Sequence, residues 1–212
     1  MITIKSFTFN PFSENTYVLY DETGEAIIID PGCYESEEFT TLFDFIETHK
    51  LTPKQIVNTH AHIDHVLGVQ AVKLKYNIPF LLHQIEEPVL KAVKTYAPNY
   101  GFVRFDEPAI DHYLIEGEKV KFGRSELKII FVPGHAPGHV AFVNEPQRFV
   151  IGGDVLFRQS IGRTDLPGGN FETLIDSIRH KLFTLDDDYT VYAGHMGPTT
   201  IGFEKKNNPF LK

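Results

Sequence analysis

The chain has 212 residues, of which 42% are hydrophobic and 23% are charged; this is typical of a globular protein and excludes a disordered or membrane-embedded one. No apolar run approaches the roughly 20 residues that a membrane span requires. Because 20 Lys and Arg stand against 28 Asp and Glu, the formal net charge is -8, and we expect neither nucleic acid nor a membrane as a partner.

The N-terminal segment 1–9 alternates between apolar and polar residues as a strand does. It lacks the continuous apolar block and the cleavage site of a signal peptide. The single cysteine, Cys33, cannot form an internal disulfide, which is typical of a reducing compartment. We therefore expect a cytoplasmic protein, with Cys33 as a small side chain in the turn 30–33.

Apolar periodicity predicts alternating strands and helices in the first half of the chain. Strands are expected at 2–9, 16–20, 25–29, 55–58 and 79–82, and helices at 36–49, 64–76 and 86–97. Ser36 is the expected N-cap of the first helix, since its hydroxyl can accept a hydrogen bond from an amide of the first turn. The segment 98–113 has no clear period and carries several aromatic residues, so we expect a packed loop there rather than a lid.

The second half repeats this alternation without a repeat in residue identity. Strands are expected at 118–122, 127–132, 139–143, 148–151 and 190–193, and helices at 171–182 and 200–206. No linker-like or low-complexity segment separates the halves. We therefore predict one α+β domain over 1–212, in which two sheets pack together and helices cover the outer faces.

Four side chains that can bind metal follow the strand predicted at 55–58. His60 and His62 lie two residues apart, so both side chains point to one face. Asp64 and His65 stand at the start of the next helix, whose first turn can hold them in place. Imidazole suits zinc or iron, and a carboxylate can bridge two cations. The cluster therefore predicts part of a site for two metal ions.

Three further candidate ligands share a second pattern, which is an apolar run, then glycine, then a ligand residue. They are His135, Asp154 and His195. Glycine allows a sharp turn and a close backbone approach at a strand end. His139 follows His135 closely, and we expect it to support the ligand loop rather than to bind metal. The remaining histidines considered are expected to be ordinary hydrogen-bonded residues: His49, His83, His112 and His180.

The ordered set His60-x-His62-x-Asp64-His65, His135, Asp154 and His195 resembles the metallo-β-lactamase superfamily over nearly the whole chain. The resemblance implies an αββα sandwich, with two mixed sheets and helices on the outer faces. It implies that one cation is held by His60, His62 and His135, and a second by Asp64, His65 and His195. Asp154 would bridge the two cations.

Within the superfamily the chain is similar to glyoxalase II-like enzymes, the hydroxyacylglutathione hydrolases, in their short bacterial form. The similarity lies in segments 153–157, 161–169 and 207–211. Arg163 falls where two-domain members carry a basic residue that contacts glutathione, so it is the expected substrate-binding residue. Asp165 and Gly197 depart from the family pattern, because the larger enzymes place tyrosines there. We therefore expect no counterpart of the helical domain that supplies further glutathione contacts in the larger enzymes.

The resemblance implies hydrolysis of a small thioester such as S-lactoylglutathione to the hydroxy acid and the thiol. Two divalent cations about 3.5–4 Å apart would lower the pKa of a bridging water, giving a hydroxide that attacks the carbonyl carbon. Asp64 is the expected catalytic residue, orienting this hydroxide or accepting its proton. Zinc is the expected metal, although the same ligands accept iron or manganese. The oligomeric state is left open.

Several alternatives remain at this point. A persulfide dioxygenase resembles the chain in the segment 162–165 and would hold one iron through two histidines and an aspartate. Lactonase or β-lactamase activity is a third hypothesis with less support. Nucleic-acid processing is opposed by the acidic net charge of the chain. A structural metal-binding module is also open, although such sites are usually closed, four-coordinate and rich in cysteine.

Overall fold

The computed structural model describes residues 1–212, which divide into two compact units. Unit 1 comprises Met1–Leu114 and Lys121–Glu126, and unit 2 comprises Ile115–Val120 and Leu127–Lys212. The chain forms two six-stranded mixed sheets and a small two-stranded one. The prediction of a single domain is not tested by this division and stays a prediction.

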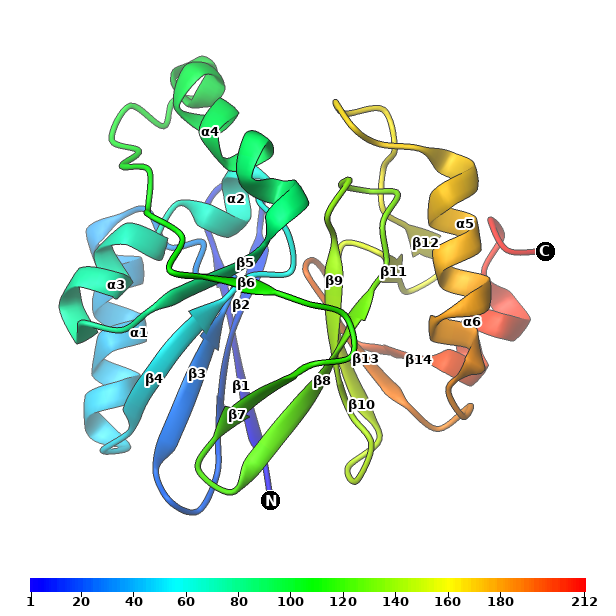
Figure 1. Ribbon diagram of the computed structural model, residues 1–212, viewed down its shortest axis with the longest axis horizontal. Helices are drawn as coiled ribbons and strands as arrows, with labels where there is room; N and C mark the ends of the chain where they lie inside the picture. The colour runs from blue at the N-terminus through cyan, green and yellow to red at the C-terminus, as the bar shows by residue number, and fades with distance from the viewer. The chain divides into compact units, whose positions relative to one another are not determined.

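The sheet of unit 1 has the strand order β1-β2-β3-β4-β5-β6 (Figure 1). Its strands are β1 (Thr3–Phe9), β2 (Glu14–Tyr20), β3 (Glu25–Ile29), β4 (Thr52–Val57), β5 (Phe80–His83) and β6 (His112–Leu114). The first three strands pair antiparallel, whereas β3 to β6 pair parallel. The parallel strands therefore place their carboxyl ends along one edge of the sheet.

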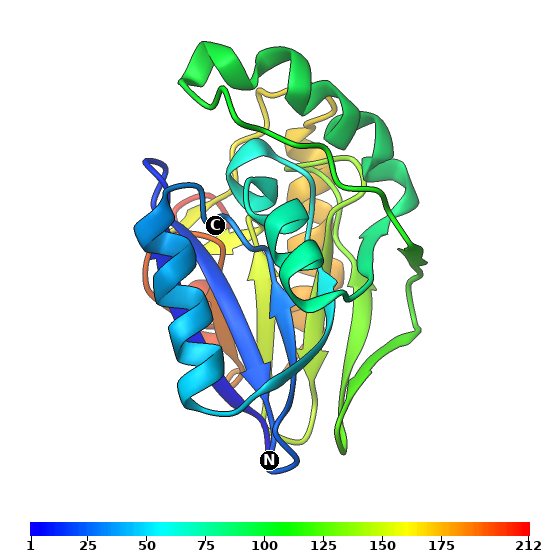
Figure 2. The ribbon, with the colours of Figure 1, turned by 90° about the vertical axis from the view of Figure 1, so that its left-hand side faces the viewer.

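Helices cover one face of this sheet. They are α1 (Ser36–Thr48), α2 (Ile63–Val66), α3 (Val69–Tyr76) and α4 (Glu87–Tyr96), with the 3-10 turns η1 (Gln84–Glu86) and η2 (Ala97–Tyr100). Leu42 and Ile46 of α1 share one buried apolar cluster with Val72 of α3 and with Ile28 and Ile56 of the strands. Figure 2 shows α1 and α3 on the same side of these strands. The amphipathic pattern of these helices predicts that their apolar faces are buried, and this burial stabilises the packing of the helices on the sheet.

The sheet of unit 2 has the strand order β14-β13-β10-β9-β8-β7. Its strands are β7 (Lys119–Phe122), β8 (Ser125–Phe131), β9 (Val140–Asn144), β10 (Phe149–Gly153), β13 (Thr190–Ala193) and β14 (Thr199–Thr200), and the separate hairpin consists of β11 (Leu156–Phe157) and β12 (Ser160–Ile161). The strands β10 and β13 are parallel, and β9 is antiparallel to β10. The carboxyl ends of β10 and β13 thus lie at the same edge of the sheet as the start of β9.

One face of the second sheet packs against α5 (Phe171–His180), η3 (Leu182–Thr184) and α6 (Ile201–Asn207). Leu174 and Ile178 of α5 join Val143 and Val150 in a buried cluster. The side chain of Asn170 begins α5 by accepting a hydrogen bond from the amide of Thr173 at 2.9 Å.

Three local predictions differ from the structure. The first helix is capped by Glu35 and not by Ser36, and Glu38 accepts a hydrogen bond from the Glu35 amide at 3.1 Å. The helix predicted at 64–76 is broken at Gly68, where a Cβ would lie 2.4 Å from the sulfur of Cys33, so only a glycine permits this approach. The segment 98–113 is not wholly a loop, because it contains η2 and enters β6. No helix of the chain has the length and apolarity needed to traverse a bilayer.

Candidate metal centre

In unit 1 the carboxyl ends of three parallel strands carry a dense group of buried polar residues. Asp30 follows β3, the segment 58–65 follows β4, and Glu86 follows β5. In sheets with parallel strands, ligands usually bind at the carboxyl ends of the strands. The topology therefore brings these side chains to one edge of the sheet.

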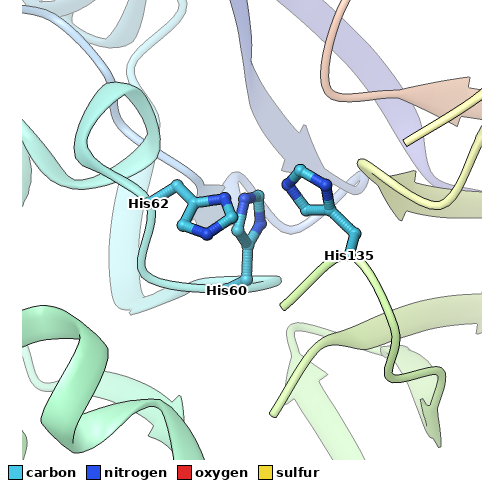
Figure 3. Close-up of side chains that lie close together, drawn as sticks. All are labelled: His60, His62 and His135. Carbon is cyan, nitrogen blue, oxygen red and sulfur yellow. The ribbon is translucent and has the colours of Figure 1, made fainter. Parts of the chain in front are cut away.

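The predicted ligands His60, His62, Asp64 and His65 lie close together in unit 1. The rings of His60 and His62 are nearly perpendicular with centroids 4.7 Å apart, and those of His60 and His65 lie 4.2 Å apart. Figure 3 shows His60 and His62 on the segment that follows β4. The Nε2 atom of His65 lies 3.6 Å from Oδ2 of Asp64. Four side chains that are able to bind metal thus converge within a six-residue stretch of backbone.

Asp30 is a buried residue of this group that the sequence analysis treated only as part of a turn. Its Oδ2 accepts hydrogen bonds from Nδ1 of His65 at 3.1 Å and from the hydroxyl of Thr59 at 2.6 Å, and its Oδ1 accepts from the Thr59 amide at 2.7 Å. Nδ1 of His65 therefore carries the proton, and Nε2 is directed toward Asp64. An apolar strand that ends in an acidic residue was the available signal, although Asp30 lacks the glycine that precedes Asp154.

Side chains of unit 1, two of them fully buried, also hold the backbone of the ligand segment. Oε2 of Glu86 accepts a hydrogen bond from the amide of Ala61 at 2.8 Å, between His60 and His62. Nδ2 of Asn58 donates to the carbonyl of His65 at 2.7 Å. Nδ2 of Asn10 donates to the carbonyl of Asp64 at 3.0 Å. The conformation of the segment is therefore fixed by the fold of unit 1 itself.

The other predicted ligands, His135, Asp154 and His195, come together in unit 2. Figure 3 shows His135 on the loop between β8 and β9. Asp154 directly follows β10, and His195 lies two residues beyond β13. One oxygen of Asp154, Oδ2, lies 3.5 Å from Nε2 of His135 and 3.4 Å from Nε2 of His195. A single carboxylate oxygen is therefore flanked by two imidazole nitrogens.

These distances fit shared metal ligands better than hydrogen bonds. Hydrogen bonds between nitrogen and oxygen cluster near 2.9–3.0 Å. Two ligands on one tetrahedral ion with bonds of about 2.1 Å lie about 3.4 Å apart. The nitrogen-to-oxygen distances in both groups, 3.4 to 3.6 Å, match this ligand spacing. The donor atoms, imidazole nitrogens and carboxylate oxygens, also suit zinc, iron or manganese.

The ligand loop of unit 2 is held by backbone contacts. Nδ1 of His135 donates to the carbonyl of Arg163 at 2.8 Å, which leaves Nε2 directed toward Asp154. The amide of Asp154 donates to Nε2 of His139 at 3.0 Å, and the supporting role expected of His139 stays a prediction. Gly162 is required at its position, because a Cβ there would lie 2.0 Å from the carbonyl oxygen of Asp154.

Gly134, just before His135, has a φ of +130°, and a Cβ there would lie 2.3 Å from the backbone of Leu174 in α5. A side chain at this position would be strained and would also collide with the helix. The pattern of glycine before a ligand, read from the sequence, thus has a steric cause at this site.

The guanidinium of Arg163, the predicted substrate-binding group, forms an ion pair with Asp165. Nε and Nη2 each lie 2.7 Å from a different oxygen of this carboxylate. These hydrogen bonds lower the pKa of Asp165 to about 2. The side chain of Arg163 is 61% exposed, so solvent and solutes reach the pair.

The histidines expected to be ordinary residues lie outside both ligand groups. Nδ1 of His49, at the end of α1, forms a hydrogen bond with the carbonyl of Phe45 at 2.9 Å. Nδ1 of His180 lies 2.7 Å from Asp176 on α5, and His83 accepts a hydrogen bond from the amide of Ile85. His112 is an exposed residue of β6.

Comparison with known proteins identifies the family. The family model described as the Metallo-beta-lactamase superfamily matches residues 9–195. The chain is 36% identical over 212 residues to hydroxyacylglutathione hydrolase GloC of Haemophilus influenzae, covering 99% of this chain and 98% of that protein.

Solved structures give the same result for the fold. The B3 metallo-beta-lactamase BLEG-1 matches with a TM-score of 0.90 and 37% identity, covering 99% of this chain and 100% of that one. TTHA1623 in a di-iron-bound form matches with a TM-score of 0.87 and 35% identity, covering 98% of this chain and 100% of that one. The predicted α+β class and metallo-β-lactamase fold are therefore confirmed, and the chain belongs to the metallo-β-lactamase superfamily as a metal-dependent hydrolase.

Proposed function

We propose that the protein is a glyoxalase II-like thioesterase that hydrolyses S-(2-hydroxyacyl)glutathione, with S-lactoylglutathione as the representative substrate. The observation that carries the hydrolytic part is the oxygen of Asp154 flanked by Nε2 of His135 and of His195. A shared oxygen with one imidazole on each side suits a bridge between two cations. The thioester part is supported by the likeness to a protein named hydroxyacylglutathione hydrolase.

The proposed ligand set follows the family resemblance. His60, His62 and His135 would hold one cation, Asp64, His65 and His195 would hold the other, and Asp154 would be shared by both. Zinc is the proposed metal, and iron is the main alternative because TTHA1623 was solved in a di-iron-bound form. Bound divalent cations would supply Lewis acidity and a water whose pKa lies near neutrality.

The residues of the chain would then orient the reactants. Water adds to the thioester carbonyl carbon and the C–S bond breaks. The proton released from water is transferred to the departing thiolate, which leaves as the thiol. Asp64 accepts this proton or directs the water, since its carboxylate stands beside His65 at the start of α2. Arg163 binds a carboxylate of the substrate through its exposed guanidinium.

The substitution Asp154→Asn tests the proposal. It keeps the shape of the side chain and removes its charge, so we expect the rate of S-lactoylglutathione hydrolysis to fall by about 1000-fold, equivalent to about 4 kcal/mol of barrier. The metal content per chain, determined by elemental analysis, should fall with it. His180→Ala is the matched control, because it removes an exposed histidine outside both groups. Wild-type turnover by the Asp154→Asn variant would contradict the proposal.

β-Lactam hydrolysis is a second candidate, favoured by the likeness to BLEG-1. A chromogenic cephalosporin assayed beside S-lactoylglutathione, with equal enzyme and metal, separates the two activities. Hydrolysis of the cephalosporin with no thioesterase activity would replace the first proposal by the second. Oxygen uptake with a persulfide substrate and a single iron per chain would instead indicate a dioxygenase.

The remaining proposals concern partners and location. We propose a small-molecule thioester as the partner, with neither nucleic acid nor membrane, and a cytoplasmic location. The acidic formal charge of -8 supports the exclusion of nucleic acid.

A further inference from the structure

The C-terminal segment contains a buried asparagine that contacts a loop near the metal ligands of unit 2. Asn208, only 1% exposed, follows α6 directly. Its Nδ2 donates to the carbonyl of Ser160 at 2.9 Å and to Oε2 of Glu204 at 2.8 Å. Its Oδ1 accepts from the amide of Phe210 at 3.1 Å. One side chain thus connects the C-terminal segment, α6 and strand β12 of the β11–β12 hairpin.

Glu204 of α6 contacts the turn of the same hairpin. Its side chain is fully buried, and its Oε2 accepts a hydrogen bond from the amide of Gln159 at 2.9 Å. Its Oε1 accepts a short hydrogen bond from the hydroxyl of Thr199. With the bond from Asn208, three donors compensate the burial of this carboxylate. Because Gln159 has a φ of +57°, the turn needs such contacts to hold its conformation.

The β11–β12 hairpin connects two parts of the metal centre. It begins two residues after Asp154 and ends two residues before Arg163. The amide of Gly162 donates to the carbonyl of Val155 at 3.3 Å, which closes the hairpin at its base. The carbonyl of Arg163 then accepts the hydrogen bond from Nδ1 of His135. A shift of the hairpin would therefore move the group that orients the His135 ring.

We propose that Asn208 and Glu204, the C-terminal clasp, are positioning residues for the metal centre. By holding the hairpin turn they fix the Arg163 carbonyl, and through it they fix the ring of His135 with Nε2 toward Asp154. The same loop carries the Arg163 guanidinium, so the clasp also sets where this group meets the substrate. The effect on turnover rests on the proposed function, whereas the effect on His135 does not.

Four variants of the full chain separate positioning from plain stability. Asn208→Ala removes both contacts of the asparagine with the hairpin and Glu204. Asn207→Ala is its matched control, because the neighbouring exposed Asn207 donates only within α6, to the carbonyl of Phe203. Glu204→Ala removes the carboxylate. Glu204→Gln is the conservative rescue, since its amide oxygen can still accept from Gln159 and Asn208 while its NH₂ donates to Thr199.

The first measurement is the ¹H–¹⁵N NMR signal of the His135 Nδ1 proton in the metal-free protein. A ring nitrogen hydrogen-bonded to a carbonyl exchanges its proton slowly with water. We expect this signal in the wild type, Asn207→Ala and Glu204→Gln, and we expect it to broaden or vanish in Asn208→Ala and Glu204→Ala. This readout needs neither metal nor substrate, so it stands even if the proposed thioesterase activity fails.

The second measurement is steady-state hydrolysis of S-lactoylglutathione by the metal-loaded protein. We expect Asn208→Ala to lower kcat by about 10- to 100-fold, the range seen when partners that orient metal ligands are removed. Glu204→Gln should restore kcat to within about threefold of wild type by keeping the hydrogen bonds. An unchanged His135 signal and kcat in a folded Asn208→Ala would overturn the proposal. If Glu204→Ala does not fold, Asn208→Ala against Asn207→Ala still decides the matter.

Discussion

Asp30→Asn is the most informative single change in unit 1, because Asp30 orients His65 without being among the predicted ligands. The carboxylate is 1% exposed and accepts hydrogen bonds from the Thr59 amide, the Thr59 hydroxyl and Nδ1 of His65. An asparagine offers one oxygen and one NH₂ in place of two oxygens. If the oxygen keeps the bond from the Thr59 amide, the NH₂ faces Nδ1 of His65.

Two N–H groups cannot bond each other, so His65 is driven to move its proton from Nδ1 to Nε2. Nε2 is the nitrogen that lies 3.6 Å from Asp64 and that would bind the cation. Metal binding must then remove this proton or rotate the ring. A lost hydrogen bond to a charged group costs about 1.5–3 kcal/mol, which agrees with the 10- to 100-fold loss of metal affinity seen for comparable changes.

The assay is competition between the protein and a chromophoric chelator for zinc, which resolves the two binding steps. We expect one step to weaken by about 10- to 100-fold and the other to change by less than about threefold. Asp44→Asn, an exposed change on α1, serves as the control. If both binding steps of Asp30→Asn keep the wild-type affinity, the reasoning is refuted. Equal weakening of both steps, with lower stability to urea, would show that the change acts through the fold.

Three further predictions concern stability and specificity. Burial opposes ionisation of Asp21, but hydrogen bonds from Thr23, Ser125 and the Arg124 amide lower its pKa to about 2. Its ionised form therefore stabilises unit 1 by about 1–2 kcal/mol above about pH 4, after solvent screening, and this contribution is lost as the pH falls through about 2. In urea unfolding, the destabilisation caused by Asp21→Ala should therefore be larger at pH 7 than at pH 3, where only part of the contribution is left. Gly162→Ala should lower kcat at least about tenfold, because the new Cβ would lie 2.0 Å from the Asp154 carbonyl oxygen, and normal kinetics would contradict this clash. Asp165→Asn should lower the KM for anionic S-lactoylglutathione several-fold and leave the KM for an uncharged thioester unchanged. The reason is that the Asp165 carboxylate, with its pKa of about 2, is ionised at every assay pH and competes with the substrate carboxylate for the Arg163 guanidinium.

Much of the fold follows from periodicity. The strands and helices predicted in both halves occur within a few residues of their expected bounds, because each buries one apolar face. The break at Gly68 could not be predicted, since the amide of Gly68 donates a hydrogen bond to the carbonyl of Pro31 at 2.8 Å, which is far away in the sequence. The predicted cap of the first helix was wrong because the Glu38 carboxylate accepts hydrogen bonds from the adjacent Glu35 amide and also from the amide of Asn10, which is distant in the sequence.

The candidate site likewise contains residues that the sequence predicts and residues that it does not. The seven predicted ligands fall into two compact groups, because a ligand at a strand end has a local pattern that a sequence displays. Asn58 and Glu86 have no such pattern, since they act on the backbone of residues brought near by the fold. Whether all seven bind metal stays a prediction. The pairing of Arg163 with Asp165 depends on a loop conformation that no periodicity specifies.

The side chains of Asn10, Asn58 and Glu86 form hydrogen bonds with the backbone of the segment 60–65, so this segment is ordered before any metal ion binds. Ordering these residues costs conformational entropy once, during folding, and not each time an ion arrives. A protein built in this way can release one kind of cation and take up another without losing its shape.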